Sequence, residues 1–147
     1  RLNTVVVLNS SGECFITLFI ARFNMKTRVL EYVNAAHTPP VIIDVMSGTS
    51  SMLRQSCVGV GMLDEMPQVG KEKISITRPT KIICYTDGLS ELTDDNGNYI
   101  GASTVVKHFP NSRPISENIA ALIDELDIRT GNPDLFDDVS ILALEIM

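Results

Sequence analysis

The chain has 147 residues, of which 44% are hydrophobic and 20% are charged, a size and composition typical of one globular domain. Its 18 acidic and 12 basic residues give a net charge of −6, which argues against a nucleic-acid binder or an anionic-membrane binder, because both need a basic patch. Apolar stretches such as Phe15–Ala21 are far shorter than the roughly 18–20 residues of a membrane span, so we expect no membrane insertion by this segment.

Strands dominate the predicted structure of the first half. The apolar residues of Leu2–Leu8 fit either the tail of a helix or the approach to a strand. Phe15–Phe23 and Arg28–Val33 are rich in β-branched and aromatic residues, and the short polar connector between them predicts a β-hairpin. Near-continuous apolarity in the first of these strands predicts burial on both faces. Two prolines then exclude a central ladder, and a strand over Val41–Val45 follows, with Ser51–Arg54 as its hairpin partner.

The second half brings the main helices, which lie between its last two strands. The clearest helix has apolar residues spaced three and four apart and a proline near its first turn. Because the helices come late instead of alternating with strands, the pattern predicts a single α+β domain and not a βαβ repeat. Strands are predicted over Lys73–Thr77, Lys81–Tyr85 and Val139–Ile146, and helices over Gly88–Leu92 (one turn), Ala102–His108 and Pro114–Ile128.

Acidic residues stand at two strand ends. Asp87 directly follows an apolar strand, and the acidic loop Asp134–Asp138 directly precedes another. Carboxylates held at strand ends are good ligands for hard divalent cations, and Gly88 would let backbone or a ligand approach closely. Two plainer interpretations stay open: Asp87 could cap the short helix that follows, and Asp137 or Asp138 could form a turn or pair with a lysine.

Two further features of the sequence are candidates for a functional site. His37 follows a strand and fits either a hydrogen-bonded structural histidine or one that faces a substrate. The segment Asp94–Asn98 suggests a calcium loop, but the sixth position is Tyr99 instead of glycine and the twelfth is Val105 instead of glutamate. The EF-hand pattern therefore fails, and a polar turn is predicted.

Five segments, in this order, resemble the SpoIIE/RsbU-type branch of the metal-dependent protein phosphatases (PPM). The Thr-Asp-Gly and Asp-Asp-Val-Ser elements are the most specific of them. One departure is Ala36, where the family usually has glycine before the histidine. The segments are Phe15–Phe19, Tyr32–Pro40, Tyr85–Glu91, Gly101 and Asp137–Leu142.

The resemblance implies a β-sandwich flanked by helices, with a dinuclear Mn²⁺ or Mg²⁺ centre. Asp87 and Asp137 match metal-ligand aspartates of the family, with Gly88 and Asp138 beside them, and His37 is a candidate for substrate binding. Two cations can activate water and orient a phosphoryl group, so no catalytic protein nucleophile is assigned. Family members remove phosphate from phosphoserine or phosphothreonine, often on anti-sigma-factor antagonists. A cytoplasmic location is expected, which three widely spaced cysteines also favour.

The family also has two acidic motifs upstream of the Phe15 strand, and residues 1–14 hold only one acid, Glu13. Asp44–Thr49 mimics one of these motifs but falls where the family has a strand and a turn, so it is rejected as a ligand. We therefore expect residues 1–147 to be the C-terminal part of a phosphatase domain that lacks the first strands and helices. Such a chain should bind at most one metal ion.

Three functional hypotheses follow. The first is a protein serine/threonine phosphatase whose 147-residue piece is inactive alone and acts, when complete, on a phosphorylated signalling protein. The second is a degenerate, non-catalytic module that binds a signalling partner. The third is a simple cation sensor with oxygen ligands. Because missing strands leave sheet edges exposed, a homodimer through those edges is also expected.

Overall fold

The computed structural model describes residues 1–10, 13–54, 56–94, 96–128 and 137–147. Contacts divide the chain into two compact units that interleave along the sequence. The first unit consists of Arg1–Pro39 and Leu53–Thr77, and the second of Pro40–Met52 and Arg78–Met147. Each unit has one antiparallel sheet and at least one helix, so the predicted α+β class is confirmed.

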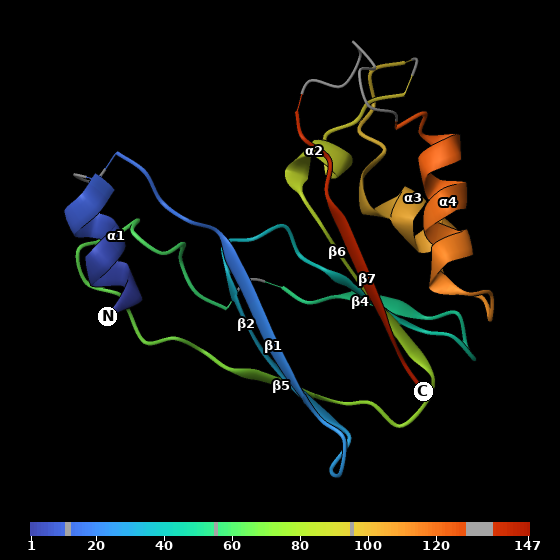
Figure 1. Cartoon of the computed structure of the whole chain (residues 1–147), viewed down its shortest axis with the longest axis horizontal. Helices are drawn as coiled ribbons and strands as arrows, with labels where there is room; N and C mark the ends of the chain where they lie inside the picture. The colour runs from blue at the N-terminus through green and yellow to red at the C-terminus, as the bar shows by residue number, and fades with distance from the viewer. Residues whose placement is uncertain (11–12, 55, 95, 129–136) are drawn as a thin grey trace. The chain divides into compact units, whose positions relative to one another are not determined.

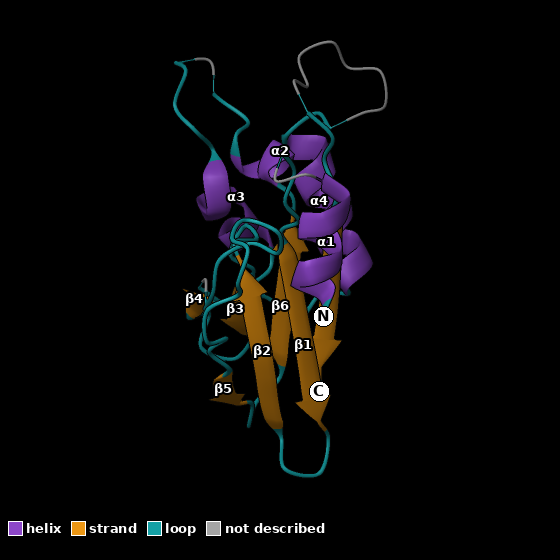
Figure 2. Cartoon of the chain, turned by 90° about the vertical axis from the view of Figure 1, so that its left-hand side faces the viewer, coloured by secondary structure: helices purple, strands orange, loops and turns teal. Residues whose placement is uncertain are grey.

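The first unit contains a three-stranded sheet with the strand order β1-β2-β5 (Figure 2). The predicted hairpin is confirmed as β1 and β2, with Ile20 opposite Val33 in the register. Of the two interpretations of the opening segment, the helix is correct. The elements of this unit are α1 (Leu2–Ser10), β1 (Leu18–Asn24), β2 (Val29–Ala35) and β5 (Glu72–Ser75).

The predicted burial of the first strand on both faces is wrong. Ile20 is 58% exposed, and neither Ala21 nor Arg22 is buried. The reason is that β1 lies at the edge of its sheet and, within the described residues, pairs with β2 alone. In β2 the side chains alternate between buried and half-buried positions, which is the pattern of a strand covered on one face.

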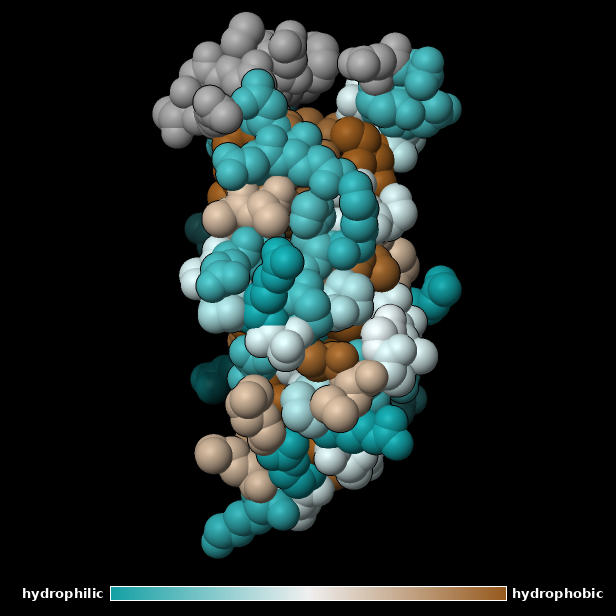
Figure 3. Space-filling view, turned by 90° about the vertical axis from the view of Figure 1, so that its right-hand side faces the viewer, coloured by the Kyte–Doolittle hydropathy of each residue, from teal (hydrophilic) through white to brown (hydrophobic). Residues whose placement is uncertain are grey.

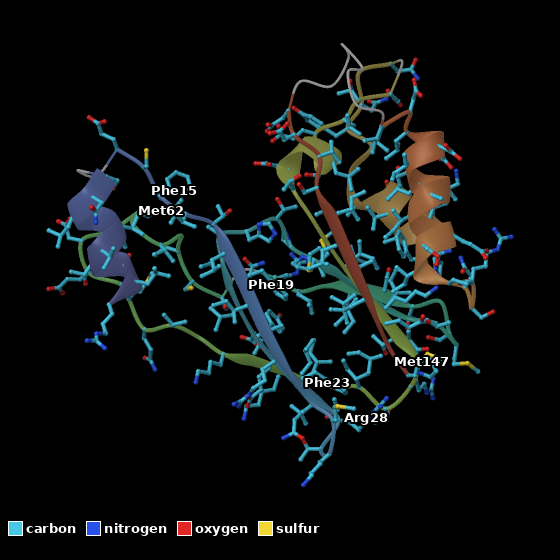
Figure 4. The ribbon with its side chains drawn as sticks, in the orientation of Figure 1. Phe15, Phe19, Phe23, Arg28, Met62 and Met147 are labelled. Carbon is cyan, nitrogen blue, oxygen red and sulfur yellow. The ribbon has the colours of Figure 1, made fainter. Side chains whose placement is uncertain are left out.

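Aromatic contacts join the two strands of the hairpin (Figure 4). The rings of Phe19 and Tyr32 lie with their centroids 5.7 Å apart, from neighbouring strands. Near the hairpin turn, the Arg28 guanidinium lies over the Phe23 ring at 5.5 Å from its centroid. Contacts of these kinds between paired strands stabilise the hairpin register.

The second unit contains a four-stranded antiparallel sheet with the order β4-β3-β6-β7, and α3 and α4 lie along one side of it (Figure 1). The predicted strands and helices of this region are confirmed to within three residues at each end. They are β3 (Val41–Asp44), β4 (Ser50–Met52), β6 (Thr80–Tyr85), β7 (Ile141–Ile146), α2 (Asp87–Ser90), α3 (Gly101–His108) and α4 (Ile115–Glu125).

Alternate residues of β3 and β6 form the core of the second unit together with the helices. This is the period of two expected for strands that present one face to a helical layer. Hydrophobic packing of this kind contributes about 25 cal/mol for each Å² of apolar surface removed from water. The buried residues of this cluster are Val41, Ile43, Ile83, Tyr85, Leu89, Val105, Phe109 and Leu122.

Lys81 is a charged residue at the centre of this unit, and its side chain is fully buried. Its Nζ donates hydrogen bonds to the carbonyl oxygens of Asn111 and Arg113, each at 2.8 Å, and to Asn118 Oδ1 at 2.7 Å. Burial lowers the pKa of this ammonium group. Its three N–H donors are matched by three acceptors, so β6 is tied to the loop between α3 and α4.

Hydrophilic side chains cover much of the face shown in Figure 3, with hydrophobic ones visible between them. In Figure 1 this is the side on which α4 lies. Glu117 and Asp124 of that helix are exposed. Across the part of the chain that the structure describes, no helix is both long enough and apolar enough to cross a membrane.

Candidate metal site at the ends of two strands

The register of β6 and β7 brings the two acidic strand ends together. Tyr85, the last residue of β6, lies opposite Ile141, the first residue of β7. Since the strands are antiparallel, the residue after β6 and the residues before β7 meet at the same end of the sheet. Figure 1 shows α2 at this end of β6, beside the start of β7. Asp87 therefore lies near the segment that contains Asp137 and Asp138.

Thr86 connects the two segments directly. Its backbone N–H donates to the Ser140 carbonyl oxygen at 3.1 Å. Its hydroxyl donates to the Asp138 carbonyl oxygen at 3.0 Å and accepts a hydrogen bond from the Ser140 N–H at 2.9 Å. Thr86 belongs to the Thr-Asp-Gly element of the sequence, but no role was predicted for it. The signal available was a hydroxyl residue between a strand and an acidic helix start.

Gly88 packs against the same acidic segment. A Cβ at this position would lie 2.6 Å from the Asp138 carbonyl oxygen and 3.1 Å from its carbonyl carbon. Only a residue without a side chain fits there, which agrees with the expectation that Gly88 permits a close backbone approach.

The carboxyl groups of Asp87 and Asp137 are exposed, and each has one oxygen engaged by local backbone. Asp87 Oδ1 accepts the Gly88 N–H at 3.2 Å, and Asp137 Oδ1 accepts the Asp138 N–H at 2.7 Å. The interpretation of Asp87 as a helix cap is wrong, because Thr86 is the N-cap of α2 and Asp87 is its first residue. The hydrogen bond at Asp137 fits the turn interpretation of that residue.

This donor set fits a hard divalent cation, because such ions prefer carboxylate oxygens. The second unit also carries 13 of the chain's 18 acidic residues and five of its 12 basic ones, which favours cation binding in that unit. Among the described residues, however, no group of three or more His, Cys, Asp or Glu side chains could hold a metal ion. Two carboxylates suffice for at most one ion. Asp134, the first residue of the acidic loop, lies outside the described residues.

His37 belongs to the first unit, whereas Asp87, Asp137 and Asp138 belong to the second. His37 is half-buried, and its backbone N–H donates to Asn34 Oδ1 at 2.9 Å. Asn34 is itself fully buried and donates through Nδ2 to the Leu53 carbonyl oxygen at 3.0 Å. This asparagine orders the turn that carries the histidine, a role that no sequence pattern predicts. A role for His37 toward a substrate stays a prediction.

Both rejected acidic motifs form turns, as predicted. Asp44 accepts hydrogen bonds through Oδ1 from the backbone N–H of Ser47 and then of Met46, and these bonds lower the pKa of its carboxyl. Asp94 accepts hydrogen bonds from the Asn98 N–H at 2.8 Å and the Asn96 N–H at 2.9 Å, and these bonds lower its pKa. Each carboxylate accepts hydrogen bonds from nearby backbone N–H groups and so stabilises its turn.

Comparison with known proteins gives a consistent set of matches. The family model described as Stage II sporulation protein E (SpoIIE) matches residues 1–147. The phosphoserine phosphatase RsbU of Bacillus subtilis (strain 168) is 26% identical over 97 residues, which make up 66% of this chain and 29% of RsbU.

Solved structures share the fold. The SiaA-PP2C domain of Pseudomonas aeruginosa matches with a TM-score of 0.71 and 17% identity, over 89% of this chain and 52% of that one. The Mn-presoaked phosphatase domain of SpoIIE from Bacillus subtilis matches with a TM-score of 0.64 and 17% identity, over 98% of this chain and 62% of that one. RsbX in complex with magnesium matches with a TM-score of 0.60 and 16% identity, over 86% and 54%. The chain thus spans between about half and two thirds of these structures.

Proposed function

This chain belongs to the SpoIIE family of serine phosphatase domains, and we propose that it supplies part of the active site of a metal-dependent protein serine/threonine phosphatase. The observation that carries the proposal is the contact between the backbone of Gly88, next to Asp87, and the backbone of Asp137 and Asp138 at one end of the β6–β7 pair. Thr86 and Gly88 hold the two segments together there.

The proposed cofactor is Mn²⁺ or Mg²⁺, one ion on this chain and two in a complete site. Relatives with the same fold include an Mn-presoaked domain and a magnesium complex, which supports this choice of ions. Asp87 and Asp137 would hold the ion through carboxylate oxygens, while Gly88 and Asp138 fix the backbone around it. When bound, such an ion supplies Lewis acidity toward a phosphoryl oxygen and activates water. The carboxylates orient that ion at the strand ends and also neutralise part of its charge.

The proposed substrate is phosphoserine or phosphothreonine on a signalling protein, such as an anti-sigma-factor antagonist, in the cytoplasm. The similarity to RsbU, a phosphoserine phosphatase, supports the phosphoserine part of this proposal. The net charge of −6 argues against nucleic acid as a partner. The choice of a signalling protein as the partner rests on the family resemblance. The placement of residues 1–147 in the C-terminal part of a larger catalytic domain stays a prediction.

The test is Mn²⁺-dependent phosphate release from a phosphoserine peptide, measured for this chain and for the product of the whole gene. We expect release from the whole product, and little from the 147 residues alone. Asp87→Asn and Asp137→Asn should each lower turnover of the whole product at least 100-fold without changing its circular dichroism. Asp44→Asn is the matched control, because this aspartate lies in a turn at the end of β3 and should leave turnover within twofold. Near-full activity of Asp87→Asn would show that the ligand assignment is wrong.

A second candidate is a non-catalytic module that binds a signalling partner. The two-carboxylate donor set favours it, because the described residues lack a third metal-binding side chain beside that pair. This candidate predicts partner binding with no phosphate release from the whole product at any Mn²⁺ concentration. A cation sensor would instead bind the metal and release no phosphate.

Pairing between copies of the chain stays a further prediction. Within the described residues, β1 and β7 each pair with one strand, so each has an open edge. Ile20 on β1 is 58% exposed and Leu142 on β7 is 66% exposed. Open edges with exposed apolar side chains favour strand pairing with another chain, and a mass measurement in solution would detect the dimer.

A further inference from the structure

Thr86 lies between the end of β6 and the start of α2. Its backbone is extended, with φ −79° and ψ 163°, and it occupies the N-cap position of α2. A threonine at this position ordinarily caps the helix with its side-chain oxygen. Here the side chain makes no such bond to the helix. Its hydroxyl instead bonds to the backbone of Asp138 and Ser140, in the segment before β7.

The hydrogen bonds of Thr86 explain how the junction works. In an antiparallel pair, the two residues at each hydrogen-bonded position exchange both N–H to carbonyl bonds. Thr86 donates its N–H to the Ser140 carbonyl oxygen, but its own carbonyl accepts from Leu89 N–H at 3.1 Å, within α2. The returning Ser140 N–H is therefore bonded to the Thr86 hydroxyl, at 2.9 Å. The hydroxyl replaces the carbonyl in the ladder and lets the chain turn into the helix at Asp87.

The second bond of the hydroxyl reaches the acidic segment itself. It donates to the Asp138 carbonyl oxygen at 3.0 Å, the same oxygen that lies 2.6 Å from the position of a Cβ on residue 88. The residues on both sides of Asp87 are thus held against one carbonyl group, next to Asp137. Little freedom is left to the backbone of Asp87 relative to that of Asp137.

We propose that Thr86 is a positioning residue, whose hydroxyl sets the placement of Asp87 relative to Asp137 for binding a divalent cation. This inference rests on the proposed function, because it assigns the two carboxylates to one ion. The hydroxyl does not touch the ion or the substrate. It acts through the backbone of Asp138 and Ser140, and a residue of the same shape without a hydroxyl should fail in the role.

The test compares Thr86→Val with Thr86→Ser in the 147-residue chain. Valine keeps the shape and the preference for extended backbone but removes the hydroxyl, whereas serine keeps the hydroxyl. Thr80→Val is the matched control, because Thr80 lies at the other end of β6 and its hydroxyl donates to the Arg78 carbonyl oxygen at 2.9 Å. Two readouts are taken by NMR: Mn²⁺-induced broadening of the Gly88 and Asp138 amide signals, and hydrogen exchange of the Ser140 amide.

We expect Thr86→Val to need at least tenfold more Mn²⁺ for half-broadening and to exchange the Ser140 amide at least tenfold faster. Thr86→Ser should stay within threefold of the wild type in both readouts, and Thr80→Val should leave both unchanged. Wild-type Mn²⁺ binding by Thr86→Val, or equal losses in the valine and serine variants, would overturn the proposal. Thr86→Ala provides the same comparison if the valine variant does not fold.

Failure of the proposed function would look different. If the wild-type chain shows no broadening at Gly88 and Asp138 up to millimolar Mn²⁺, these carboxylates do not form a metal site, and the positioning role falls with them. If the wild type binds and only the valine comparison fails, the metal site stands and the role of Thr86 is wrong.

Discussion

Gly88 packs directly against the carbonyl group of Asp138, at a distance that leaves no room for a side chain. Two residues far apart in the sequence thereby bring the end of β6 and the start of β7 into backbone contact. Because Asp87 precedes one and Asp137 precedes the other, this contact also holds the backbones of the two aspartates close together.

The first prediction concerns this contact. Gly88→Ala would place a Cβ 2.6 Å from the Asp138 carbonyl oxygen, so the two backbones must move apart. We expect the free energy of unfolding, measured by urea denaturation, to fall by about 1–3 kcal/mol. Gly70→Ala is the control, because the nearest atom there is the Ser56 carbonyl oxygen at 3.4 Å, and it should cost no more than about 0.5 kcal/mol. Equal stability of Gly88→Ala and the wild type would contradict the close packing.

The second prediction concerns the buried ammonium group. Lys81→Met removes the donor from two backbone carbonyls and from Asn118 Oδ1. Buried acceptors left without partners are costly, so unfolding free energy should fall by about 3 kcal/mol. Lys107→Met gives the comparison, since its 2.6 Å pair with Glu125 is on the surface and solvent screens such pairs, so this variant should lose much less stability. A smaller loss for Lys81→Met than for Lys107→Met would argue against a structural role of the buried lysine.

The third prediction concerns the turn before His37. Ala36 has a φ of +54°, in the left-handed region that disfavours residues with a Cβ. This is the position where the resemblance expects glycine, so Ala36→Gly should raise the unfolding free energy by about 0.5–1 kcal/mol. Ala35→Gly, one residue earlier in β2 and 2% exposed, should instead lower it by about 1 kcal/mol. Destabilisation by both changes would mean that Ala36 is not strained.

The fourth prediction is a dependence on pH. Hydrogen bonds from Lys73 and then Arg22 lower the pKa of Glu31 from 4.5 to about 2. Because its pKa is lower in the folded chain, the carboxylate stabilises the fold above pH 4.5, and this contribution is lost as the pH falls from 4.5 to about 2. Glu31→Gln should therefore lower the urea midpoint slightly at pH 7 and match the wild type near pH 2. Glu117→Gln, on the exposed side of α4, serves as the control. A Glu31→Gln difference that is the same at both pH values would refute the assignment.

Local sequence patterns determined most of the elements. Alternating and β-branched runs predicted the strands, and the spacing of apolar residues after Pro114 predicted α4 to within three residues at each end. The local pattern also predicted the polar turn at Asp94, because short polar side chains bond to nearby backbone, whereas the strand and turn at Asp44 were expected from the family resemblance. These features depend on neighbours along the chain, and so the sequence is sufficient for them.

Contacts between residues distant in the sequence decided the acidic site, the exposure of β1 and the burial of Lys81. The sequence identified acidic residues at two strand ends, and only the β6–β7 register placed those ends together. It predicted a buried first strand, but the position of a strand in its sheet sets its exposure, and β1 lies at an edge. Lys81 could be buried only because acceptors 30 to 37 residues away converge on its Nζ. Tertiary structure decides such features because they depend on groups that are distant in the sequence and adjacent only after folding.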